Sequence, residues 1–175
     1  MSYIILAVLF IFSGFFMKFS DDAYDVNHDL NLATVFGILC GIASAVAAVS
    51  DVGATYIFLA ILIGNLLALK VDGIHHIITL IIFVIVCLIY GIPELSLVTL
   101  IICVLSALTD EIGHETISKI TENKFLNLFF EYRFVMKIVI LLLAVYGSLN
   151  VLVFVCFILF EISYVTAGII FEKLN

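Results

Sequence analysis

Apolar residues gather in seven long runs along this chain, and short polar segments separate the runs. The runs cover residues 2–18, 31–50, 53–70, 74–91, 95–110, 134–149 and 150–170. A helix needs ~20 largely apolar residues to cross the hydrocarbon core of a bilayer, and each run comes close to that length. The shorter runs can be accommodated by local thinning of the bilayer. The pattern predicts about seven membrane helices, with residues 134–170 forming either two short helices or one long interrupted helix.

Three of the breaks, at residues 50–53, 91–94 and 147–150, have the composition of tight turns. We expect the helices that flank each of these breaks to form antiparallel hairpins. Small residues also recur every four positions within residues 37–45 and 60–68. That spacing lets membrane helices approach one another closely, so it predicts helix packing.

The composition supports a membrane location. Of the 175 residues, 65% are hydrophobic and only 12% are charged, and the mean hydropathy is +1.36. A soluble domain is nearer half apolar and carries about twice that share of charge. We therefore expect an all-α, polytopic transmembrane helix bundle, in which residues 1–175 form a single multi-pass domain in the cell membrane. We interpret Ile4–Phe16 as a retained helix rather than a secretory signal.

The charges are distributed unevenly in this layout. All seven basic residues fall on one side of the predicted membrane: Lys18, Lys70, Lys119, Lys124, Arg133, Lys137 and Lys173. The positive-inside rule then places the N-terminus outside and the C-terminus in the cytoplasm. Eleven of the fourteen acidic residues share the cytoplasmic side, while Asp51 and Glu94 lie outside and Glu161 lies within a span. Because the rule does not require acidic residues, their concentration needs a separate explanation.

The first acidic cluster spans residues 21–29 and contains His28. If it is helical, Asp22, Asp25 and Asp29 stand at positions i, i+3 and i+7 and share one face. A divalent cation would relieve their mutual repulsion, and Mg²⁺ commonly bridges carboxylates to substrate phosphates. The sequence therefore predicts a metal site here, with an acidic, solvated loop as the alternative.

Two further clusters follow at the cytoplasmic ends of the third and fifth predicted helices. The second, at residues 70–76, contains Lys70, Asp72 and His75. The third offers two pairs of metal ligands four residues apart: Asp110 with His114, and Glu111 with Glu115.

All three clusters contain an acid-x-x-His pattern: Asp25–His28, Asp72–His75 and Glu111–His114. Glu-x-x-His on facing helices holds metal in di-iron bundles. We expect the clusters to meet in one polar site, with Asp25, Asp72 and Asp110 approaching one another, although the pattern does not select the metal.

The segment Asp21-Asp22-x-x-Asp25-x-x-x-Asp29 resembles the first aspartate-rich motif of the UbiA superfamily of intramembrane prenyltransferases. That family carries a second acidic motif four helices later on the same face, as the cluster at residues 110–115 does here. The family has more helices than the seven predicted here, and its second motif reads Asp-x-x-x-Asp, whereas position 114 is His.

The resemblance implies Mg²⁺-dependent transfer of an isoprenoid from its diphosphate. Asp22, Asp25 and Asp29 would hold one Mg²⁺, or another divalent metal, and Asp110 and Glu115 would hold a second ion. The departing diphosphate would be neutralised by Lys70 together with Lys119 or Arg133. The expected partners are a membrane lipid and an isoprenoid diphosphate or other lipid phosphate, and no nucleic acid.

Two other classes of function remain open. A carboxylate within the membrane, such as Glu161, is usually functional or paired, so a transporter for a divalent cation or a proton is one alternative. A non-catalytic membrane subunit whose charged face docks a partner is the other. An enzyme predicts clusters that converge over an apolar cavity open to lipid, a transporter predicts a polar track from the clusters past Glu161 to the outer side, and a docking subunit predicts clusters splayed into solvent.

Overall fold

The computed structural model of the protein describes residues 2–71 and 73–174, and in these residues the regular structure is entirely helical. The helices are α1 (Tyr3–Asp25), α2 (Leu30–Ser50), α3 (Val52–Leu67), α4 (Ile74–Tyr90), α5 (Leu97–Ile120), α6 (Lys124–Glu131), α7 (Phe134–Val145) and α8 (Val151–Leu174). The all-α prediction is confirmed for this part of the chain. Each of the seven apolar runs forms a helix, and α6 is an additional short helix that the hydrophobic pattern did not predict.

Four of the helices, α1, α2, α5 and α8, are long and apolar enough to cross a membrane. The apolar helices α3, α4 and α7 are shorter, at 10–17 residues. Residues 134–170 form two helices rather than one, because Gly147 adopts a φ of 77° in the turn between α7 and α8. A positive φ of this kind is open to glycine without steric cost and ends the helix.

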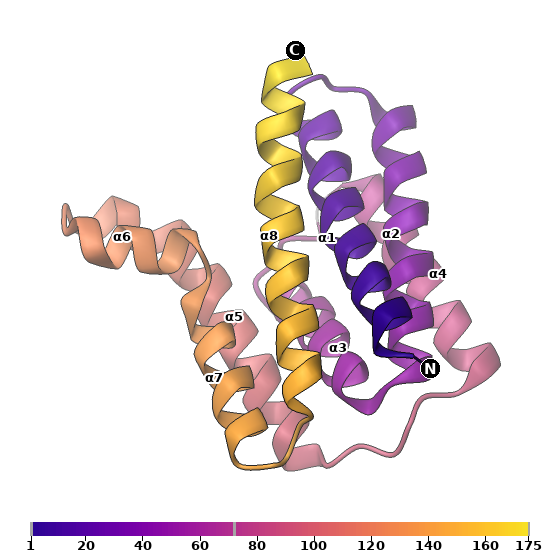
Figure 1. Cartoon of the computed structure of the whole chain (residues 1–175). Helices are drawn as coiled ribbons and strands as arrows, with labels where there is room; N and C mark the ends of the chain where they lie inside the picture. The colour runs from indigo at the N-terminus through magenta and orange to yellow at the C-terminus, as the bar shows by residue number, and fades with distance from the viewer. Residues whose placement is uncertain (1, 72, 175) are drawn as a thin grey trace.

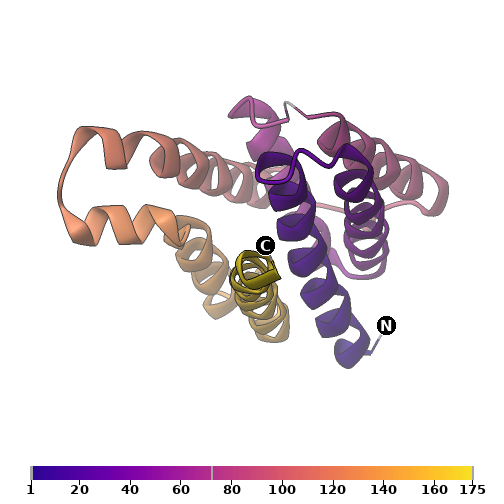
Figure 2. The same ribbon diagram turned by 90° about the horizontal axis from the view of Figure 1, so that it is seen from above.

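The helices pack in two groups, which meet where α2 contacts α3 and where α7 contacts α8 (Figures 1 and 2). Helix α1 packs along both α2 and α8, and α4 packs on the other side of α2. Helix α3 packs on α5, and α7 contacts both α5 and α8. Helices α1 and α8 run in the same direction, so the chain starts near one end of the bundle and finishes at the other (Figure 1). Helix α6 projects sideways from the far end of α5 and α7.

The hairpin prediction holds for the turn before α3 but was wrong for residues 91–94. Asp51 caps α3, because its Oδ1 accepts hydrogen bonds from the amides of Gly53 and Ala54. After α4, by contrast, the chain crosses the lower end of the bundle in an extended segment, so that α4 packs on α2 and α5 packs on α3 (Figure 1). Pro93 favours an extended residue before it, and the Tyr56 hydroxyl accepts a hydrogen bond from the Ser96 amide at 2.5 Å.

The core is apolar and tightly packed where the helices meet. Its largest fully buried side chains include Phe10, Ile57, Ile140 and Phe157, which come from four different helices. At Gly14 the backbones of α1 and α8 approach so closely that an added Cβ would lie 2.3 Å from the carbonyl oxygen of residue 160. Small residues permit such approaches between membrane helices.

Candidate functional site

A cavity of about 270 Å³ lies among α1, α3, α5 and α8, close to the starts of α4 and α7. Residues of all three acidic clusters line it together with residues that the sequence did not single out. The polar lining consists of Lys18, Asp21, Asp25, Asn65, Lys70, His76, Asp110, Glu111, Arg133, Glu161 and Tyr164. Five carboxylates therefore share the cavity with three permanent cations, so negative charge is in excess.

Helix α1 contributes one face of the cavity because it continues beyond its apolar run as far as Asp25. Asp21 and Asp25 are four residues apart on this helix, and both line the cavity. The Tyr164 hydroxyl of α8 donates a hydrogen bond to Asp21 Oδ2 at 3.3 Å. Lys18 also lines the cavity, and its Nζ lies 2.8 Å from Asp22 Oδ1. Asp21 and Asp25 thus form a carboxylate pair at the C-terminal end of α1, with Asp21 half-buried and Asp25 exposed.

The prediction that Asp22, Asp25 and Asp29 share one helical face was wrong, because α1 ends at Asp25. His28 takes a left-handed φ of 53°, and Asp29 caps α2 by accepting a hydrogen bond from the Leu32 amide at 3.0 Å. Aspartate is a favoured N-cap, since its carboxylate satisfies an amide that has no partner within the helix. Of the three aspartates, only Asp25 lines the cavity. The exposed His28 ring lies near the carbonyl of residue 24.

The third cluster divides between the cavity and the surface. Asp110 is buried and caps α7 from a neighbouring helix: its Oδ1 accepts from the Val135 amide at 3.0 Å, and its Oδ2 accepts from the Met136 amide at 2.7 Å. Glu111 is also buried, and its Oε1 accepts from Arg133 Nε at 2.7 Å. Both carboxylates line the cavity, so the structure places Asp25 and Asp110 at one site.

Three further predicted residues, all on α5, are not among those that line the cavity. His114, Glu115 and Lys119 are exposed along the last turns of α5. Glu115 forms an ion pair with Lys70 at 2.5 Å, which links α5 to the segment after α3. Lys70 itself lines the cavity. Asp72 lies outside the described residues.

Arg133 is the basic residue held most firmly in the site. It occupies a left-handed position between α6 and α7, with a φ of 48°, and its guanidinium carbon lies 5.6 Å from the centre of the Tyr164 ring. Burial opposes its charge, but the neighbouring Tyr164 and Glu111 side chains raise the pKa of Arg133 above its ordinary value. Arg133 therefore remains cationic at neutral pH.

Glu161 of α8 faces the cavity and is paired. Its Oε2 lies 2.8 Å from Lys137 Nζ, and both side chains are largely buried. Toward the start of α8 the interior is filled by the fully buried side chains of Phe10, Ile57 and Phe157. The pair therefore lies at the inner limit of the polar region, next to a closed apolar core.

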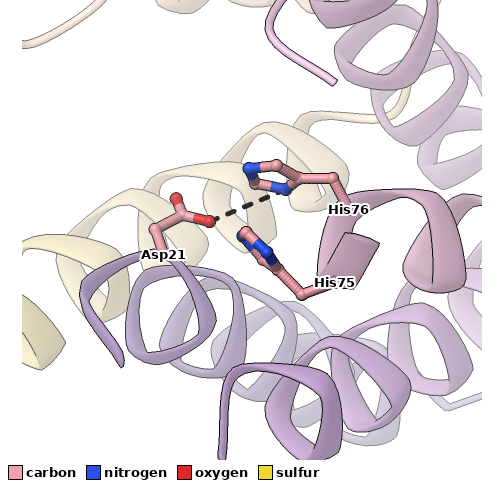
Figure 3. A group of neighbouring side chains, drawn as sticks. All are labelled: Asp21, His75 and His76. Atoms are coloured by element: carbon pink, nitrogen blue, oxygen red, sulfur yellow. Dashed lines mark ion pairs between the residues drawn. The ribbon is translucent and has the colours of Figure 1, made fainter. Parts of the chain in front are cut away.

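Two histidines at the start of α4 face Asp21 of α1 (Figure 3). His75 is buried and His76 is half-buried. One potential ligand atom from each of the three side chains lies within 4.8 Å of the other two. His75 was predicted from the sequence, whereas His76 was not, and Asp21 entered only through the resemblance to the aspartate-rich motif.

A second, smaller cavity of about 100 Å³ adjoins the first. It shares Asp21, Asn65 and His76 with the larger cavity, and its other walls are mainly apolar. Those walls include Phe58, Leu62, Leu80 and Phe83. Asn65 and Tyr164 were missed from the sequence, although a polar residue inside an apolar run, as Asn65 is, is a recognised sign of a functional site.

Together the two cavities join a charged region, with both carboxylates and cations, to an apolar one. Carboxylates are ligands for divalent cations, and the cations nearby suit a phosphate group. Comparison of the chain with protein-family models, curated proteins and solved structures gives no significant match.

Proposed function

We propose that this protein is a metal-dependent membrane enzyme that acts on an isoprenoid diphosphate or a related lipid phosphate, by prenyl transfer of the UbiA kind. One observation carries the proposal: acidic residues from α1 and α5 meet Lys18 of α1, Lys70 of the segment after α3 and Arg133 of the turn before α7 around a single cavity. The enzyme alternative requires this convergence. A docking subunit would instead present its charged clusters to solvent.

In this proposal Asp25, which lines the larger cavity, would hold Mg²⁺ or another divalent cation at the end of α1. The bound cation would supply positive charge next to the diphosphate, as Mg²⁺ commonly does. When the bond between the isoprenoid carbon and the diphosphate oxygen breaks, the electron pair stays with the diphosphate. Lys18, Lys70 and Arg133 would stabilise that negative charge together with the bound cation.

The apolar lining has a role in the same reaction. Met17 and Ile61 line both cavities, and Phe58 and Phe83 line the smaller one. An isoprenoid chain would lie against these side chains, because burying apolar surface is favourable. Exclusion of water would also protect a reactive isoprenoid from hydrolysis.

The proposed orientation follows from the charges. All seven apolar helices would be embedded in the cell membrane, with the N-terminus outside and the C-terminus in the cytoplasm. The cavity would then open toward the cytoplasmic side, where soluble diphosphates are available. The short helices α3, α4 and α7 would require local thinning of the bilayer or burial against their neighbours.

A cation or proton transporter is the alternative that Glu161 supports. Two features favour the enzyme. Glu161 is engaged with Lys137, and the buried rings of Phe10 and Phe157 fill the core beyond it. A transport route would have to break that pair and displace those rings.

Ligand-dependent thermal stabilisation tests the proposal. The protein is purified in detergent and heated with Mg²⁺, with farnesyl diphosphate, with both, or with neither. Selective binding to the folded state at one hundred times the Kd adds about 2.7 kcal/mol to its stability. We expect the largest rise in midpoint with both ligands, a much smaller rise in Asp25→Asn, and a wild-type response in Glu122→Gln, which changes an exposed acid outside the cavity.

Two results would contradict the enzyme proposal. The first is an identical response of wild type and Asp25→Asn to every ligand. The second is a response to Mg²⁺ alone that Glu161→Gln abolishes and Asp25→Asn does not, which would favour the transporter.

A further inference from the structure

A carboxylate of α1 and the two imidazoles that open α4 form a compact group (Figure 3). One ligand atom from each of Asp21, His75 and His76 lies within 4.8 Å of the other two. The three residues are distant in the sequence, and the packing of both α1 and α4 on α2 brings them together. The group is therefore a product of the tertiary fold.

The spacing of these atoms suits a bound ion better than a direct contact. His76 Nδ1 lies 3.9 Å from Asp21 Oδ1, beyond the ~3.2 Å limit of a good hydrogen bond. Ligand bonds of about 2.0–2.1 Å place two ligand atoms about 3.4 Å apart at a tetrahedral angle and about 4.2 Å apart when opposite each other. The separation of this pair falls between these values, so an ion can lie between Asp21 and His76, and a ligand atom of His75 lies within 4.8 Å of theirs.

The second carboxylate oxygen of Asp21 is held separately. Tyr164 donates a hydrogen bond to Oδ2, whereas Oδ1 is buried and accepts no hydrogen bond from the described residues. An outer hydrogen bond that orients a ligating carboxylate is a common feature of metal sites. Tyr164 thus acts as a positioning residue that turns Oδ1 toward the two rings.

The group is also accessible to an ion from the cavities. Asp21 and His76 line both the larger and the smaller cavity. Three protein ligands leave at least one coordination position of the metal for water or another oxygen ligand. Such an open position distinguishes catalytic metal sites from closed structural ones.

The ligand atoms indicate the class of metal. Mg²⁺ and Ca²⁺ prefer oxygen ligands, whereas imidazole suits zinc, copper, iron and nickel. Two imidazoles and one carboxylate therefore favour a first-row transition ion. We propose that Asp21, His75 and His76 form a binding site for a Zn²⁺-type transition metal ion, separate from the Mg²⁺ position at Asp25. This proposal does not depend on a lipid phosphate substrate, because metal binding is measured without one.

Titration with Co²⁺ alone tests the site. Co²⁺ replaces Zn²⁺ in such sites and gives a visible absorption band that depends on the ligands and their geometry. The full chain is purified in detergent with a histidine-free tag, stripped with a chelator, and titrated. We expect one Co²⁺ per chain, and we expect Zn²⁺ to displace it and remove the band while Mg²⁺ in excess does not.

Substitutions locate the ion. Loss of even an outer-shell partner weakens metal binding by roughly 10–100-fold, so His76→Ala and Asp21→Asn should weaken it by at least about tenfold. The matched control is His28→Asn, which removes an exposed imidazole outside the cavity and suits the left-handed backbone there. It should bind Co²⁺ like wild type. His75→Ala should also lose binding, and far-ultraviolet circular dichroism shows whether that variant folds.

Tyr164→Phe separates the positioning role from simple stability. This variant should bind Co²⁺ more weakly and shift its band, while its unfolding midpoint without metal stays close to that of wild type. The proposal is overturned if wild type binds no Co²⁺, if folded His76→Ala binds it as wild type does, or if His28→Asn loses it equally. Failure of Mg²⁺ and farnesyl diphosphate to stabilise the protein would refute the enzyme proposal and leave the Co²⁺ result unaffected.

Discussion

Replacing Asp110 with alanine should destabilise the protein strongly, because this carboxylate caps α7 from the adjacent helix α5. Its two oxygens accept hydrogen bonds from the Val135 and Met136 amides at 3.0 and 2.7 Å. Asp110→Ala leaves both donors without their acceptors. A buried donor without a partner costs about 1–3 kcal/mol, and loss of an N-cap costs about 0.5–2 kcal/mol. Residue 135 is only half-buried and water can reach it, so we expect about 2–4 kcal/mol in total.

The free energy of unfolding of the Asp110→Asn variant should lie between those of wild type and Asp110→Ala. Its amide keeps one acceptor oxygen and loses the negative charge near the positive end of the α7 dipole, which is worth up to ~2 kcal/mol in partly buried sites. For a chain of this size each 1 kcal/mol shifts the midpoint by about 2–4 °C. The expected loss in Asp110→Ala is therefore roughly 4–16 °C, measured by thermal unfolding in detergent.

Thr109→Val is the matched control on the same helix. The Thr109 hydroxyl is exposed, and among the described contacts it bonds only within α5. The free energy of unfolding of Thr109→Val should therefore stay within ~0.5 kcal/mol of that of wild type. Equal stability of Asp110→Ala and wild type would refute the capping role. The same variants test whether Asp110 is a metal ligand: a cap predicts that Asp110→Asn retains the wild-type response to Mg²⁺, whereas a ligand predicts that the response is lost.

Two further predictions concern packing and orientation. Gly14→Ala should lower the free energy of unfolding by about 1–3 kcal/mol, because the added methyl group would meet the backbone of residue 160. The exposed Val8→Ala is the control, and equal stabilities of Gly14→Ala and wild type would contradict the close approach. In cells, a cysteine at position 94 should react with a membrane-impermeant thiol reagent added outside, whereas one at position 173 should react only after the cells are opened. The reverse pattern would overturn the proposed topology.

The helices of this protein were largely predictable because the signal for a membrane helix is local. A long apolar run has to bury its backbone polar groups in hydrogen bonds of its own, so each of the seven runs had to become a helix. The turns at Asp51 and Gly147 were predictable from the sequence for the same reason, because helix capping and a positive φ depend on only one or two residues. The residues 91–96 did not form a hairpin, because the packing partners of α4 and α5 are set by surfaces that the turn composition does not encode.

The site was predictable only in outline. The sequence places the acidic clusters at one end of the bundle, and from this we predicted that Asp25, Glu111 and Lys70 belong to one site. These three residues do line one cavity. The role of each residue depended on what lies across from it. Asp29 became a cap because α1 ends four residues earlier, and Asp110 meets the amides of a helix that begins more than twenty residues later. His76 faces Asp21 because α1 and α4 both pack on α2. Hydrophobic periodicity specifies which residues enter the membrane, whereas hydrogen-bonding and ligand geometry need atoms within a few ångströms, and only the packing of distant helices brings them there.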